Sequence, residues 1–123
     1  MNHDILVSEK VIGCAIEVHK ALGPGLLERP YHMGLCVELA HQGLHFDRDR
    51  MIPLVYRDVK IGEYHPDLIV EDTVVVEVKS ALRWEDVFTA QMLTYLRLTG
   101  RRVGLIINFN KPLLREGIKR VVL

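Results

Sequence analysis

The sequence predicts an α+β domain in which helices cover a sheet that contains a strand–helix–strand crossover. Apolar residues recur at helical spacing in two segments between residues 8 and 42. Two runs rich in Val, Ile and Leu then flank a polar turn at residues 71–73. A helical segment at 84–98 separates this hairpin from an apolar strand at 102–108, as in a crossover unit. With 123 residues, 49% of them apolar, the chain is predicted to fold as one domain, residues 1–123.

The two N-terminal helices are predicted from their ends. Ser8 is expected to cap a first helix that runs to about Leu22, where the Gly-Pro-Gly sequence at 23–25 stops it. A second helix is predicted over residues 28–42, and Gly43 follows its end. The first helix presents a broad apolar stripe.

Strands are predicted over residues 45–48, 52–57, 59–70, 73–81 and 102–108, with a last edge strand at 118–123. These segments are rich in β-branched and aromatic residues and are bounded by turn-forming residues. A tight turn centred on Asp72 would place Leu68 opposite Val76 and Asp67 opposite Glu77.

Three polar residues converge on one face of this predicted hairpin. Glu77 and Lys79 are two residues apart in a strand and therefore point to the same side. Directly opposed residues of an antiparallel pair share a face and lie about 5 Å apart, so Asp67 joins them. The other face is predicted to be apolar, with Leu68, Val70, Val74, Val76 and Val78.

The predicted cluster has the chemistry of a metal-dependent phosphodiesterase. Two neighbouring carboxylates repel each other unless a cation lies between them. Mg²⁺ or Mn²⁺ takes oxygen ligands and keeps waters, which suits Asp67, Glu77 and a substrate phosphate. Lys79 would orient or deprotonate the attacking water, or offset charge in the transition state.

An ordinary hairpin with a solvated polar face is the alternative interpretation. It is weakened by the apolar neighbours Ile69 and Val75 on the same face. They indicate an inner strand, where an unpaired charge is costly.

Two further residues are candidates for the same site. Glu28 begins the second helix and would be a third acid at the metal, although a carboxylate at a helix start also interacts well with the helix dipole. Gln91 lies on the helix after Lys79 and would contact a phosphate or orient the water, although a glutamine often only satisfies a backbone group.

Charge balance excludes a polybasic nucleic-acid binder. The chain has 16 Lys and Arg against 16 Asp and Glu, so its formal net charge is zero. A nuclease with this charge needs a local basic patch or a partner. Arg101-Arg102 and Lys119-Arg120 are the predicted patch.

The cysteines, the N-terminal sequence and the apolar runs favour a cytoplasmic location for the protein. Cys14 and Cys36 form no metal or redox motif and are expected to be reduced core residues. The N-terminal sequence lacks the features of a signal peptide, and no apolar run reaches membrane-spanning length.

Taken together, these residues resemble the GxxExxY proteins, a family of the PD-(D/E)xK nuclease superfamily with the restriction-endonuclease-like fold. The resemblance covers essentially the whole chain and rests on residues 16–28, Tyr31, Asp67, Glu77-Val78-Lys79, Gln91, Tyr95-Leu96 and 105–110. It implies a mixed central β-sheet flanked by helices and a nucleic-acid substrate, DNA or RNA.

The resemblance also implies roles for the site residues. Asp67 and Glu77 match the metal acids, Lys79 the catalytic lysine, Glu28 the acid of the first core helix, and Gln91 a glutamine found in many members. The implied cofactor is Mg²⁺ or Mn²⁺.

Two positions depart from the pattern of the family. Members tend to carry His-Glu where this chain has Phe88-Thr89, and Arg-Ala where it has His65-Pro66. The departures put in doubt a contribution to chemistry at the first position and a phosphate contact at the second.

Two rival functions fit the same fold. One is a catalytically inactive module that binds nucleic acid without a metal. The other is a protein-interaction subunit, a homodimer in which the apolar strand at 118–123 pairs with its copy.

Overall fold

The computed structural model describes residues 2–123 and confirms the α+β class. Its elements are α1 (His3–Leu22), α2 (Glu28–His41), β1 (Phe46–Arg48), β2 (Ile52–Tyr56), β3 (Val59–Tyr64), β4 (Leu68–Val70), β5 (Val74–Lys79), α3 (Asp86–Thr99), β6 (Val103–Asn108), the short 3₁₀ helix η1 (Leu114–Gly117) and β7 (Ile118–Val122). None of the helices in residues 2–123 has the length and apolar character needed to cross a membrane.

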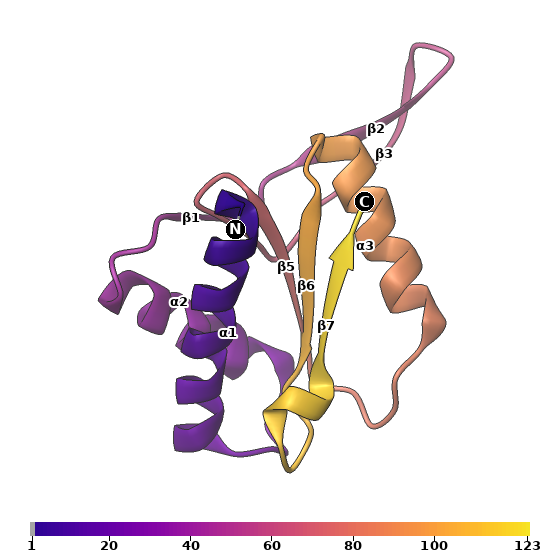
Figure 1. Cartoon of the computed structure of the whole chain (residues 1–123). Helices are drawn as coiled ribbons and strands as arrows, with labels where there is room; N and C mark the ends of the chain where they lie inside the picture. The colour runs from indigo at the N-terminus through magenta and orange to yellow at the C-terminus, as the bar shows by residue number, and fades with distance from the viewer. Residues whose placement is uncertain (1) are drawn as a thin grey trace.

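The central sheet is mixed and has five strands in the order β1-β4-β5-β6-β7. β5 and β6 are parallel and are joined by α3, so the predicted crossover is confirmed. The other neighbouring strands run antiparallel. In Figure 1, α1 and α2 lie on one side of this sheet and α3 lies on the other.

The predicted register of the β4–β5 hairpin is confirmed. Leu68 pairs with Val76 and Val70 with Val74. Glu71 and Asp72 form the turn with φ of 52° and 54°, a left-handed geometry that matches the twist of tight hairpins. This register brings Asp67 level with Glu77 at the far end of the hairpin.

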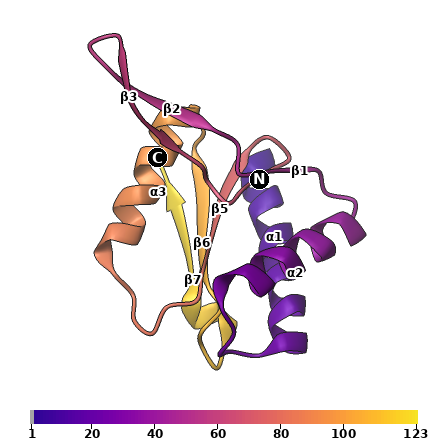
Figure 2. The ribbon, with the colours of Figure 1, turned by 180° about the vertical axis from the view of Figure 1, so that it is seen from behind.

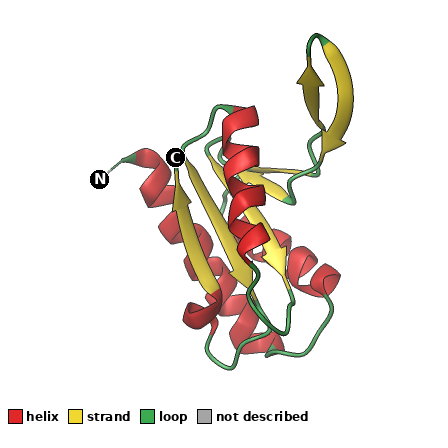
Figure 3. Cartoon of the chain, turned by 90° about the vertical axis from the view of Figure 1, so that its right-hand side faces the viewer, coloured by secondary structure: helices red, strands yellow, loops and turns green. Residues whose placement is uncertain are grey.

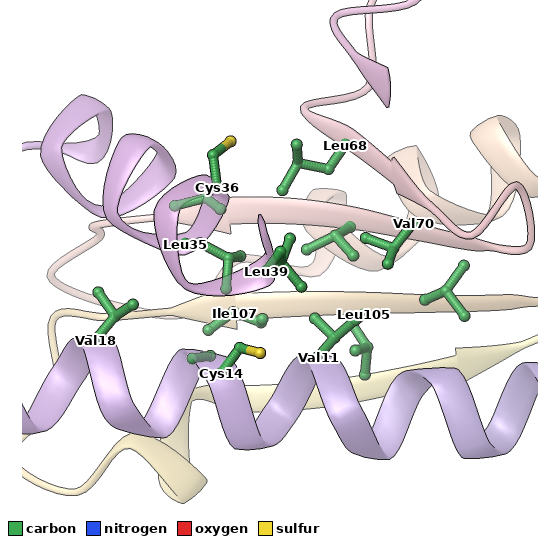
Figure 4. Close-up of a cluster of buried hydrophobic side chains, with 14 of the residues drawn as sticks. Val11, Cys14, Val18, Leu35, Cys36, Leu39, Leu68, Val70, Leu105 and Ile107 are labelled. Carbon is green, nitrogen blue, oxygen red and sulfur yellow. The ribbon is translucent and has the colours of Figure 1, made fainter. Parts of the chain in front are cut away.

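Each face of the sheet buries its own apolar cluster. The larger cluster packs the sheet against α1 and α2, and Figure 4 labels its members Val11, Cys14, Val18, Leu35, Cys36, Leu39, Leu68, Val70, Leu105 and Ile107. The smaller cluster joins the sheet to α3 and includes Ile69, Val75, Met92, Leu96 and Ile106. Cys14 and Cys36 are buried and unpaired, as predicted.

The predicted strand over 59–70 is wrong as a single element, because it divides into β3 and β4. Pro66 lies in the break; it has no backbone N–H and also restricts the residue before it. β3 pairs only with β2, in a separate two-stranded hairpin. This hairpin projects beyond the central sheet in Figures 2 and 3.

The first helix begins at His3 and not at Ser8. The Ser8 hydroxyl donates to the carbonyl oxygen of Ile5 at 2.7 Å, a bond typical of a serine inside a helix. Val7 is buried in the core, so the apolar stripe continues one turn further than the serine cap suggested. Tertiary packing of that turn favours the longer helix.

Gly117 is a position where we expect a large loss of stability. A Cβ atom there would lie 2.1 Å from the backbone carbonyl oxygen of Asn108, which has no side-chain freedom to move away. Gly117→Ala is expected to destabilise the protein by about 1–3 kcal/mol, the usual cost of overpacking. Gly13→Ala is the matched control: nothing lies within 4 Å of its Cβ position in α1. Thermal unfolding of both variants tests this, and an equal melting temperature for the two would contradict it.

Candidate active site

The Asp67 and Glu77 carboxylates each accept a backbone hydrogen bond across the open end of the β4–β5 hairpin. Glu77 Oε1 accepts a hydrogen bond from the backbone N–H of Asp67 at 2.8 Å. Asp67 Oδ2 accepts one from the backbone N–H of Val78, also at 2.8 Å. The two carboxylates are therefore fixed side by side, as the predicted register required.

One oxygen of each carboxylate stays available to a ligand. Within residues 2–123, neither Asp67 Oδ1 nor Glu77 Oε2 accepts a hydrogen bond from the backbone. The nearest nitrogen atoms of basic side chains are His32 Nδ1, 3.9 Å from Asp67 Oδ1, and Lys79 Nζ, 3.8 Å from Glu77 Oε2. Polar groups thus form a row from α2, across the end of β5, toward α3.

Lys79 continues this row to α3. Its ammonium group donates to Gln91 Oε1 at 3.4 Å and lies 4.8 Å from the centre of the Phe88 ring. The side chain is 17% exposed, so its charge sits in a largely enclosed site. The structure therefore places the Gln91 amide next to the lysine, and its predicted contact with a phosphate or a water stays a prediction.

Burial makes the pair of acids an unfavourable place for negative charge. Desolvation, followed by the Asp67 carboxylate, raises the pKa of Glu77 from 4.5 to about 8, although the amide of Asp67 and the charge of Lys79 act against it. Burial also raises the pKa of Asp67. A divalent cation would relieve this repulsion, and hard carboxylate oxygens are the ligands that Mg²⁺ and Mn²⁺ prefer.

Asp67 and Glu77 fit a metal as a pair of neighbouring acids. Among the described residues, no group of three His, Cys, Asp or Glu side chains is arranged to hold an ion. Asp67 and Glu77 would therefore be the protein ligands, and water or substrate oxygens would supply the rest, as is common for Mg²⁺.

Glu28 lies beside this pair without joining it. It is exposed on the first turn of α2 and lines the same small cavity as Asp67. Its charge contributes to the raised pKa of Glu77, so the two carboxylates act on each other.

Tyr31 fixes the loop that leads to Glu28. The Tyr31 hydroxyl donates to the carbonyl oxygen of Gly23 and accepts from the N–H of Leu26 at 3.1 Å. Its ring is buried and stacks on Phe109, with centroids 4.6 Å apart. Tyr31 is thus a packed core aromatic that also closes the α1–α2 loop.

Asn108 fixes the loop on the other side of the site. Its amide clamps the backbone of Ala81, accepting from the N–H at 3.0 Å and donating to the carbonyl at 3.1 Å. Since Asn108 pairs with Lys79 across the parallel strands, the clamp holds the chain just after the lysine.

His32 is a candidate residue that sequence reasoning missed. Its Nε2 atom is buried and has no hydrogen-bond partner among the described residues, while Nδ1 faces Asp67. The available signal was its spacing: His32 follows Glu28 by four residues, which places both on one face of α2. Two arginines, Arg29 and Arg48, line the cavity that His32 and Asp67 share.

The fold and the cluster together define a class of protein. A mixed sheet whose central strand carries a glutamate and a lysine two residues apart, opposite an aspartate, is the framework of the PD-(D/E)xK nucleases. Residues 6–121 match the family model of the PD-(D/E)XK nuclease superfamily, so the chain belongs to this superfamily. No curated protein and no solved structure matches the chain. Nucleases of this superfamily typically use divalent metal ions and act on nucleic acid.

Proposed function

We propose that the protein is a metal-dependent nuclease that cleaves phosphodiester bonds in DNA or RNA. The observation that carries this proposal is the enclosed row of Asp67, Glu77 and Lys79, in which each acid keeps one oxygen for a ligand. A purely structural hairpin would gain nothing from a buried Glu77 and a partly buried Asp67 whose pKa values are raised.

Asp67 and Glu77 are the proposed ligands of Mg²⁺ or Mn²⁺, and Glu28 supports them from α2. The bound ion would polarise the phosphate and favour ionisation of water for the attack. The protein's own part is to hold the two carboxylates rigidly, through the backbone bonds of Asp67 and Val78.

Lys79 is the proposed catalytic lysine. Its ammonium group is within reach of the space beside Glu77 Oε2, where it would position the attacking water and offset the charge that develops on the phosphate. Gln91 is a positioning residue in this proposal, because its carbonyl oxygen holds the ammonium from the side of α3.

The basic residues nearest the acids favour binding of a polynucleotide backbone at this end of the sheet. Arg29 and Arg48 line the cavity beside Asp67. Two of the four residues in the patch suggested from the sequence are engaged elsewhere, since Arg101 pairs with Asp72 and Arg120 with Glu9. Arg29 and Arg48 are therefore the better candidates for phosphate contacts.

The finer parts of the proposal rest on particular residues. The GxxExxY assignment is supported by Gly25, Glu28 and Tyr31, of which Tyr31 closes the loop before α2. A cytoplasmic location is supported by the two free, buried cysteines. Formation of a homodimer is supported only by the position of β7 at the edge of the sheet.

Metal binding followed by cleavage tests the function. In calorimetry, Mn²⁺ is expected to bind the wild-type protein and not the variant Asp67→Asn, Glu77→Gln. Amides are preferred to alanines because their carbonyl oxygens still accept the two backbone hydrogen bonds. The wild type is then expected to cut DNA or RNA strands only with Mg²⁺ or Mn²⁺ present.

The matched control carries Asp58→Asn and Glu63→Gln, which remove two acids on the exposed β2–β3 hairpin. This control is expected to bind Mn²⁺ and to cleave like the wild type. Equal Mn²⁺ binding by the site variant would contradict the proposal, and metal-independent nucleic-acid binding without cleavage would favour the inactive module.

A further inference from the structure

A second cavity adjoins the candidate site on the side of α3. It has a volume of about 460 Å³ and is lined by Tyr64, Lys79, Val87, Phe88, Ala90, Gln91 and Thr94. Lys79 and Gln91 belong both to this cavity and to the row of candidate catalytic groups. A ligand that fills the cavity therefore lies directly beside the phosphate that the proposed nuclease function places at Lys79.

The walls of this cavity suit a flat, uncharged ring. Phe88 and Tyr64 are partly exposed there, and each is held from behind by another aromatic residue. Trp84 meets the Phe88 ring edge-on at 5.3 Å, and Tyr95 meets the Tyr64 ring edge-on at 5.8 Å. Rings that are already fixed lose little freedom when a ligand stacks on them.

The polar groups of the cavity suit the edge of a nucleobase. Gln91 accepts from Lys79 through Oε1, and among the described residues its amino group donates no hydrogen bond. It is therefore available to a carbonyl oxygen or ring nitrogen. Among residues 2–123 the lining contains no acidic side chain, and its one charged group is the Lys79 ammonium.

We infer that this cavity, here called the base pocket, binds one unpaired nucleobase of the strand that is cut. The inference rests on the proposed nuclease function, because Lys79 links the pocket to the phosphate. A base stacked within a duplex cannot offer its faces to protein side chains, whereas an unpaired base can. The substrate is then a single strand, or a strand end or loop, and the pocket holds the nucleotide beside the scissile bond.

Comparison of strands with and without bases tests the inference. The probes are a seven-nucleotide deoxyadenosine strand, its RNA counterpart, and a seven-unit abasic strand with the same phosphate charge. Calorimetry in EDTA is expected to give affinity for one of the base-bearing strands about tenfold or more above that for the abasic strand, as one stacked base typically provides. Equal affinities, or no binding of any strand, would overturn the inference.

Phe88→Leu locates the effect. This variant is expected to lose the preference for base-bearing strands while it keeps its affinity for the abasic strand. Tyr56→Leu is the control, because it removes an aromatic ring that is 61% exposed on the β2–β3 hairpin, outside the lining of the pocket. A preference that persists in Phe88→Leu, or that falls equally in both variants, would overturn the assignment.

Trp84 gives a second readout that does not depend on cleavage. It is the only tryptophan of the chain and packs on Phe88, so a base in the pocket is expected to change its fluorescence. Base-dependent binding in a protein that never cleaves would remove the nuclease proposal and leave the pocket. Metal-dependent cleavage without any preference for bases would overturn the base pocket and leave the nuclease proposal.

Discussion

Lys79→Ala is expected to lower kcat for cleavage by at least about a hundredfold, with little change in fold. A positioned proton-transfer or charge-stabilising group typically contributes about 10²–10⁴ in rate. Lys79 is the only cation that contacts both Glu77 and Gln91 among the described residues, so no neighbour replaces it. Initial rates of cleavage with saturating Mg²⁺ give kcat and KM separately.

Lys60→Ala is the control for this prediction. Lys60 pairs with Glu63 on the exposed β2–β3 hairpin, and its removal changes the net charge by the same amount. The control is expected to keep the wild-type kcat. A Lys79→Ala protein that cleaves at the wild-type rate would refute the proposed role of the lysine.

The metal-free protein is expected to lose stability as pH rises from about 4.5 to about 8. The folded-state pKa of Glu77 is raised to about 8, above its ordinary 4.5. The native state then holds a proton that the unfolded state has released, so the free energy of unfolding falls with pH across this window. The stabilisation that protonated Glu77 provides is fully present below pH 4.5. Its loss by about pH 8 lowers the free energy of unfolding by an amount on the order of a few kcal/mol. Urea unfolding in EDTA at several pH values measures it.

Glu77→Gln is expected to remove most of this dependence, because the amide does not titrate and still accepts from the Asp67 N–H. Glu63→Gln is the matched control. Glu63 is exposed, and its pKa is lowered by Lys60, so its titration lies below the window. A Glu77→Gln protein with the same slope as the wild type would show that another group carries the effect.

The hairpin and its acids were predictable because they depend on local pattern. Alternation of side chains in β4 and β5 assigns Leu68 and Val76 to one face and leaves no choice for Glu77. A slip of one residue would turn Glu77 to the opposite face, among the apolar residues under α1 and α2, which is energetically unfavourable. The crossover was also predictable from the sequence, since parallel strands need a long connection between them.

Other features were not predictable because they depend on contacts between distant segments. His32 meets Asp67 across 35 positions of sequence, and the amide of Asn108 reaches Ala81 across 27. No local pattern carries such pairings. The predicted start of α1 at Ser8 was wrong for a related reason. Burial of Val7, a tertiary effect, outweighed the capping tendency of Ser8.

The ties around the candidate site affect how the protein opens. Ser80 bonds the carbonyl oxygen of Leu26, Tyr31 bonds that of Gly23, and Asn108 holds Ala81. Loops of this kind usually exchange their amide protons through small local openings. Here each loop is fastened by a residue of another segment, two of them buried. We therefore expect the loops around Lys79 to open together with the core, and the β2–β3 hairpin, which pairs with no strand of the central sheet, to open more readily.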